Sequence, residues 1–169
     1  VVTSGLLYLG SYTITEVTAP EGYLLDDTPH DVTLAYGGQD VALVTESLTI
    51  ENAPQMGQIV ITKVDSETGN PITLSNAAFK LKDADGQYVT QTVYYPREME
   101  LDTFTTDATG SVTLPETVGW GLYSIKEGTA PDGYLLSDEE IEIFVGSSGD
   151  TPGSIYELEI EIPNDPVKG

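Results

Sequence analysis

The sequence predicts an all-β protein, folded as an antiparallel β-sandwich. Six segments alternate apolar and polar side chains with the period of two that is typical of half-buried strands. They are residues 58–64, 78–82, 111–114, 122–126, 140–145 and 155–162. Glycine-rich and aspartate-rich turn signals separate them, at residues 65–69, 83–86, 107–110 and 146–153. Helical periodicity of useful length is lacking, and short strands spaced by such turns over about 100 residues indicate a sandwich.

An internal repeat is the second observation behind this prediction. YTITEVTAPEGYLL at residues 12–25 recurs as YSIKEGTAPDGYLL at residues 123–136, an offset of 111 positions (123 − 12). An asparagine ends the last apolar strand after each copy. The gap from Glu16 to Asn52 is 36 residues (52 − 16), and the gap from Glu127 to Asn164 is 37 (164 − 127). A glutamate inside an alternating strand, at a fixed distance from a strand-terminal asparagine, indicates a site rather than a turn.

The repeat predicts two modules of unequal completeness. Residues 55–166 contain a full set of strands, whereas residues 1–54 contain about three, expected at 11–17, 31–36 and 41–51. Half a sandwich of this size exposes an apolar face and is marginally stable. We therefore interpret residues 1–54 as the C-terminal half of a module whose other half precedes Val1 in the parent protein. Residues 167–169 are expected to be a linker or tail.

Composition excludes several function classes. The chain has 28 acidic against 6 basic residues, a net charge of −22, so we expect no nucleic-acid partner and no binding to anionic membranes. There is no cysteine, and no apolar run is long enough to insert into a bilayer. His30 is the only histidine, and the DADG at residues 83–86 fits a hairpin turn better than a calcium loop. We therefore expect no metal and no cofactor.

One lysine differs from the other basic residues. Lys63 shares a strand face with Ile59 and Ile61, which indicates that its side chain points into the core. Burial lowers the pKa of a lysine and makes a neutral, nucleophilic amine available. The other basic residues fit exposed strand, loop or tail positions.

A carboxyl and an amide are expected beside this lysine. Glu127 shares a strand face with Ile125 and should also point inward. A buried carboxyl can be protonated at neutral pH, so we expect Glu127 to donate to the carbonyl oxygen of Asn164 and then to carry protons to a departing ammonia. The alternative is a buried ion pair of Lys63 and Glu127, with Asn164 as a hydrogen-bonding strand cap.

The second module resembles the Cna protein B-type domains, the prealbumin-like modules of Gram-positive surface adhesins and pilins. The resemblance is carried by GQIVITK at residues 57–63, the TG at 68–69, the AF at 78–79, the TDATG at 106–110, YSIKE with APDGY at 123–134, and Asn164. It implies an isopeptide bond between Lys63 and Asn164 that Glu127 promotes. The first module keeps Glu16 and Asn52, but residues 1–62 contain no lysine, so this bond cannot form within residues 1–54.

The resemblance favours a non-enzymatic function, apart from one autocatalytic cross-link. We expect a structural stalk or pilin-type module, extracellular and anchored to the cell wall outside this fragment. Its expected partners are neighbouring modules of the same polypeptide and a lysine-bearing strand from the upstream half. The alternative is an adhesin module that binds a host protein or glycan. Residues 94–99 are the first place to seek such a ligand, although we favour a loop that packs its own tyrosines. The LPET at residues 114–117 is interpreted as a strand end and turn.

Overall fold

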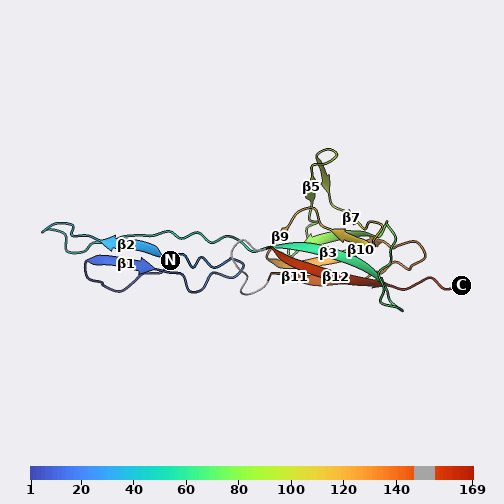
Figure 1. Ribbon diagram of the computed structural model, residues 1–169, viewed down its shortest axis with the longest axis horizontal. Helices are drawn as coiled ribbons and strands as arrows, with labels where there is room; N and C mark the ends of the chain where they lie inside the picture. The colour runs from blue at the N-terminus through green and yellow to red at the C-terminus, as the bar shows by residue number, and fades with distance from the viewer. Residues whose placement is uncertain (147–154) are drawn as a thin grey trace.

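The computed structural model describes residues 1–146 and 155–169 and confirms the all-β sandwich (Figure 1). Within these residues the strands are β1 (Gly10–Ile14), β2 (His30–Leu34), β3 (Met56–Asp65), β4 (Ala78–Asp83), β5 (Gln91–Val93), β6 (Met99–Leu101), β7 (Phe104–Thr105), β8 (Ser111–Thr113), β9 (Val118–Gly119), β10 (Gly121–Thr129), β11 (Glu140–Val145) and β12 (Tyr156–Asn164). No helix in this part of the chain has the length and hydropathy needed to cross a membrane.

Two sheets form the sandwich. One has the order β11-β10-β4-β7, and the other has the order β12-β3-β8 with β9 also paired to β3. Apolar side chains from both sheets form one core, which includes Ile61, Phe79, Ile125 and Ile162. The pairing is antiparallel except between β3 and β12, which run parallel. This departure from the expected antiparallel pattern places the first and last strands of the sandwich side by side.

The six predicted strand segments correspond to β3, β4, β8, β10, β11 and β12. The other strands after residue 56, β5, β6, β7 and β9, were not predicted, and each spans only two or three residues. The turn expected at residues 146–153 lies, after Gly146, outside the described residues.

The first part of the chain forms an antiparallel hairpin of β1 and β2. The third strand expected there, at residues 41–51, is wrong, because the structure has no strand in that range. Its counterpart in the second part is β12, which is held by parallel pairing with β3. Residues 1–53 contain no strand equivalent to β3, so residues 41–51 have no neighbouring backbone with which to form a ladder.

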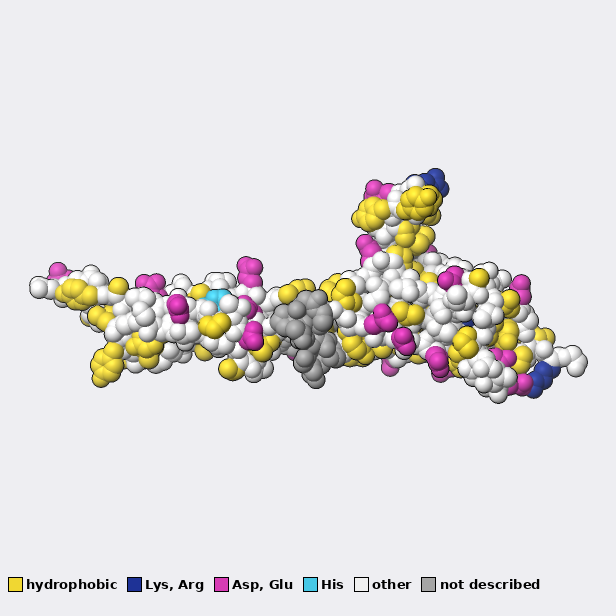
Figure 2. Space-filling model, in the orientation of Figure 1, with side chains coloured by type: hydrophobic (Ala, Val, Ile, Leu, Met, Phe, Trp, Pro, Cys, Tyr) yellow, Lys and Arg dark blue, Asp and Glu magenta, His cyan; other side chains and the backbone are white. Residues whose placement is uncertain are grey.

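A hairpin of β5 and β6 projects from the sandwich (Figures 1 and 2). Tyr94 and Tyr95 at its tip are 71% and 90% exposed, so the expectation that this loop packs its own tyrosines is wrong. Its base is fixed where the Gln91 amide exchanges two hydrogen bonds with the main chain of Glu116 and the Thr92 N–H donates to the Glu116 carboxylate (3.0 Å). The same contact holds the 114–117 segment as a turn after the buried Leu114.

The two parts of the chain meet at Trp120. A Cβ placed on Gly22 would lie 3.2–3.4 Å from three carbons of the indole ring, so the ring lies directly against the Gly22 backbone. The main chain of Gln55 links the two sides. Its backbone N–H donates to the Gly22 carbonyl (2.8 Å), and its backbone carbonyl accepts from the backbone N–H of Trp120 (3.1 Å). The junction therefore depends on a glycine in the first repeat copy.

We predict that Gly22→Asn will expose Trp120. Gly22 has a φ of +82°, which asparagine tolerates better than other residues, so the main effect should be a collision with the ring. Trp120 is the only tryptophan, and its fluorescence emission should move to longer wavelength. Gly86→Asn is the matched control, since its φ is +77° and a Cβ there meets open space. Equal emission from the two variants would contradict the proposed contact.

Candidate functional site

The structure brings three polar side chains together inside the sandwich. Lys63, Glu127 and Asn164 are 0%, 4% and 2% exposed. Lys63 and Asn164 lie on the neighbouring strands β3 and β12, whereas Glu127 lies on β10 of the other sheet. Buried polar groups are costly unless they satisfy one another, so this cluster needs a specific explanation.

Lys63 reaches the cluster because the alternation of β3 directs its odd-numbered side chains inward, with Ile59 and Ile61 also buried. Its Nζ lies 3.2 Å from Oε1 of Glu127 and 5.7 Å from the centre of the Phe79 ring. The contact with Glu127 is an ion pair without the alignment of a hydrogen bond. Burial lowers the pKa of Lys63, and the neighbouring Glu127 carboxylate opposes this shift. The neutral amine is therefore easier to reach than in a solvent-exposed lysine.

Backbone groups fix Asn164 and Glu127. The Asn164 amide nitrogen donates to Oε2 of Glu127 (2.8 Å) and to the carbonyl of Leu135 (2.6 Å). The Ser137 N–H donates to the same carboxylate oxygen (3.0 Å). Because both neighbours of the amide are acceptors, its nitrogen and not its oxygen faces Glu127. The expectation that Glu127 donates to the Asn164 carbonyl oxygen is therefore wrong for this structure.

One carboxylate thus bridges an amine and an amide. Oε1 of Glu127 contacts the nitrogen of Lys63, and Oε2 contacts the amide nitrogen of Asn164. A group in this position can take a proton from an attacking amine at one oxygen and deliver it to a departing nitrogen at the other. The alternative, an ion pair capped by an asparagine, makes the same contacts.

The first repeat copy forms the same arrangement without a lysine. The Asn52 amide nitrogen donates to Oε2 of Glu16 (2.6 Å) and to the Leu24 carbonyl (3.0 Å), and the Asp26 N–H donates to the same Glu16 oxygen (3.1 Å). Each contact matches one around Glu127 at an offset of 111 or 112 residues (127 − 16 and 164 − 52). Glu16 and Asn52 are half-buried.

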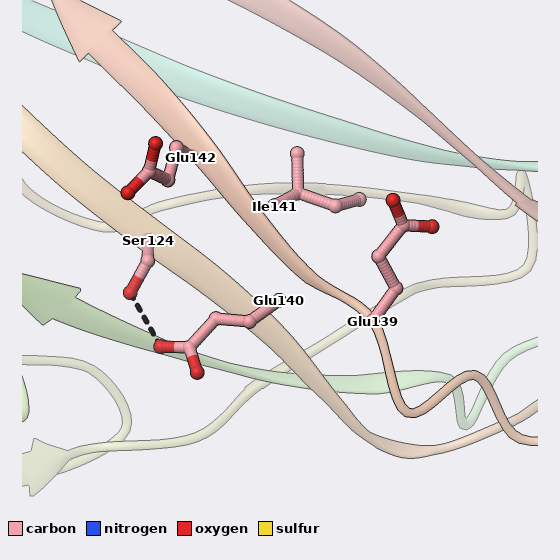
Figure 3. A pocket seen from close by; sticks show the side chains of 5 residues that line it. All are labelled: Ser124, Glu139, Glu140, Ile141 and Glu142. Carbon is pink, nitrogen blue, oxygen red and sulfur yellow. Dashed lines mark hydrogen bonds between the residues drawn. The ribbon is translucent and has the colours of Figure 1, made fainter.

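A shallow pocket on the outer face of β10 and β11 offers less chemistry (Figure 3). Glutamates dominate its lining, and Ser124 donates to Glu140 (2.7 Å). Glu140 also accepts from Lys82 (2.9 Å), so these groups satisfy one another at the surface. The sequence did not single out this pocket, and its contacts resemble an ordinary charged strand face.

Comparison with solved structures supports the fold. The chain is similar to the Bacillus anthracis TIE protein at 27% identity and a TM-score of 0.68, over 95% of this chain and 26% of that one. It therefore spans about a quarter of that protein's length. The group B streptococcus pilus 2b backbone protein is similar in fold at 23% identity and a TM-score of 0.51, over 90% of this chain and 52% of that one. GBS52, the minor pilin of Streptococcus agalactiae, is similar in fold at 17% identity and a TM-score of 0.54, over 96% and 63%.

Comparison with curated proteins gives no match. The family described as SpaA, prealbumin-like fold domain, matches residues 1–48 and 57–157. This match includes segments from both repeat copies and covers most of the chain, and it agrees with the prealbumin-like sandwich expected from the resemblance. The chain belongs to the SpaA prealbumin-like fold domain family.

Proposed function

We propose that this chain is a structural, pilin-type module of a Gram-positive cell surface, stabilised by a covalent bond between Lys63 Nζ and Asn164 Cγ. The observation that carries the proposal is the Glu127 carboxylate, which contacts the nitrogen of each partner. The family match and the pilins among the similar structures support the structural role. We place the module outside the cell, in a polypeptide anchored to the wall through another segment.

The reaction needs no added reagent. The Lys63 ammonium first gives one proton to Oε1 of Glu127, and the resulting neutral amine attacks Cγ of Asn164 and forms the new C–N bond. The protonated Glu127 gives this proton to Nδ2 as the bond from Cγ to Nδ2 breaks, and it takes the second amine proton in return. The departing ammonia then carries that second proton away as ammonium. One amine and one amide give one substituted amide and ammonia. Glu127 returns to its starting state.

Burial favours the covalent product over a permanent ion pair. A buried pair must repay the desolvation of two charges, and the Lys63 Nζ has no well-aligned acceptor among the described residues. The amide that replaces it carries no charge. The product also closes a loop of 101 positions (164 − 63), which by analogy with a disulfide of that span stabilises the fold by about 4 to 5 kcal/mol.

The position of the bond suits a module that is under mechanical tension. β3 and β12 are the first and last strands of the sandwich, and they lie side by side and parallel. A bond from Lys63 to Asn164 would carry tension applied at the two ends of the sandwich directly from one strand to the other. The backbone of residues 64–163 would be bypassed. This gives a protein without cysteine a covalent brace.

We predict that the intact mass of the protein is below the sequence mass by one ammonia. Glu127→Gln should have the full mass of its sequence, because the amide keeps the shape of the side chain but cannot carry the proton. Lys63→Met should also lack the ammonia loss. Both should melt lower, by roughly 15 °C, because neither closes the loop between β3 and β12. Mass spectrometry with thermal unfolding measures both effects.

Two exposed substitutions serve as controls for that experiment. Lys126→Met on β10 and Glu161→Gln on β12 change the same residue types at exposed positions and should keep the ammonia loss. An unmodified mass for the unsubstituted protein would refute the bond. Continued ammonia loss in Glu127→Gln would refute the role of the carboxyl.

We further propose that residues 1–54 are part of a second module of the same kind, and that Glu16 and Asn52 form its acceptor site. The absence of lysine from residues 1–62 and the lack of ladder pairing for residues 41–51 support this interpretation. By analogy with β12 and β3, a parallel strand carrying a lysine would pair with residues 44–52 and bring its amine to Asn52.

A peptide with the sequence of β3, residues 56–65, should therefore bind to this segment and form an adduct at Asn52. The adduct mass should equal chain plus peptide minus one further ammonia. The same peptide with methionine in place of its lysine should bind without an adduct. In the chain, Asn52→Ala should prevent the adduct with the lysine peptide. Failure of the lysine peptide both to bind and to react would contradict the half-module proposal.

A further inference from the structure

The C-terminal end of the sandwich repeats the backbone geometry of the junction at Gly22. At the junction, the contacts are Gln55 N–H to Gly22 O (2.8 Å), Leu24 N–H to Ala53 O (2.8 Å) and a bridge between Tyr23 and Pro54. At the C-terminal end they are Val167 N–H to Gly133 O (2.8 Å), Leu135 N–H to Asp165 O (2.9 Å) and a bridge between Tyr134 and Pro166. The central glycines have φ values of +82° and +85°. The two turns are therefore the same structural unit.

The sequence similarity continues to the last residue. NAPQMG at residues 52–57 and NDPVKG at residues 164–169 share asparagine, proline and glycine at the same spacing. Gly57 lies near the start of β3, where a Cβ would collide with Val145, so the position requires a glycine. Gly169 occupies the equivalent position after the second turn.

The two turns differ in what covers them. Trp120 lies against Gly22, whereas a Cβ on Gly133 would have nothing within 4 Å. Leu24 is 5% exposed and its counterpart Leu135 is 55% exposed. Gln55 is 8% exposed and its counterpart Val167 is 57% exposed. Three positions that are covered at the first junction are thus open at the second, and we call Gly133, Leu135 and Val167 the C-terminal turn surface.

We infer that the C-terminal turn surface is the docking site for a further prealbumin-like module, which follows Gly169 and lays an aromatic side chain equivalent to Trp120 against Gly133. The occupant is identified by the Gly22 junction, where a glycine without a side chain leaves flat backbone that an indole ring covers. The Leu135 and Val167 side chains add apolar area beside it, as expected of an interface within a chain.

This docking site would set the angle between successive modules. This docking does not depend on the covalent bond, because the side chains of the three surface residues lie outside the buried cluster, and only the main-chain carbonyl of Leu135 contacts it, through Asn164. It adds a partner and a contact point to the proposed structural role. Modules joined through the same turn would repeat one geometric relation along the polypeptide, so that tension passes along a regular array.

The test is a fusion protein in which residues 58–169 follow Gly169 directly. Trp120→Phe in the original module leaves the tryptophan of the added module as the only reporter. Its emission should lie at shorter wavelength, and its quenching by acrylamide should be several-fold weaker, than in the same fusion with Gly133→Asn in the original module. Gly86→Asn is the matched control, because it has similar φ and open surroundings and should leave the emission unchanged.

A second variant protects the test against misfolding at Gly133. Leu135→Glu changes an exposed side chain and keeps the main-chain carbonyl that accepts from Asn164, so it should leave the melting temperature of the unfused chain unchanged while increasing quenching in the fusion. If neither Gly133→Asn nor Leu135→Glu changes the emission or quenching of the fusion, the docking proposal is wrong. Dimerisation of the unfused chain that Leu135→Glu abolishes, measured by sedimentation, would assign the surface to a second copy and also overturn it.

Discussion

The contact of one buried carboxylate with two nitrogens is the constraint on which the sandwich depends. Glu127 reaches across the core from one sheet to Lys63 and Asn164 on the other, and each of the three is nearly inaccessible to solvent. Removing any one of them would leave a buried charge or amide without its partner. The parallel pairing of β3 with β12 follows the same requirement, because it places the amine and the amide on adjacent strands.

The first repeat copy shows that backbone groups set the acceptor half of this arrangement. Asn52 and Glu16 adopt the contacts of Asn164 and Glu127, including the hydrogen bonds to a leucine carbonyl and a backbone N–H, although no lysine is present. The amide and carboxylate are therefore organised before any amine arrives. Preorganisation of this kind lowers the entropy cost of the step that we propose, since only one group has to find its place.

Strand alternation explains why much of this could be predicted from sequence. A period of two located the long strands and directed Lys63 and Glu127 inward, and both side chains are buried. Strand alternation could not predict the orientation of the Asn164 amide, because this orientation depends on the Leu135 carbonyl, which no side-chain pattern reveals. The prediction of a strand at residues 41–51 was wrong for a related reason, because a strand-like sequence forms a ladder only beside another strand. The exposed Tyr94 and Tyr95 show that aromatic composition alone does not predict burial in a hairpin tip.

Tryptic peptide mapping tests the covalent bond most directly. Trypsin cleaves after unmodified lysine, so a bond at Lys63 should block cleavage there and leave residues 1–80 joined to residues 127–168 as one branched species. Fragmentation of this species should place the link between Lys63 and Asn164, with one ammonia missing. Two separate linear peptides, one ending at Lys63 and the other containing an unmodified Asn164, would contradict the bond.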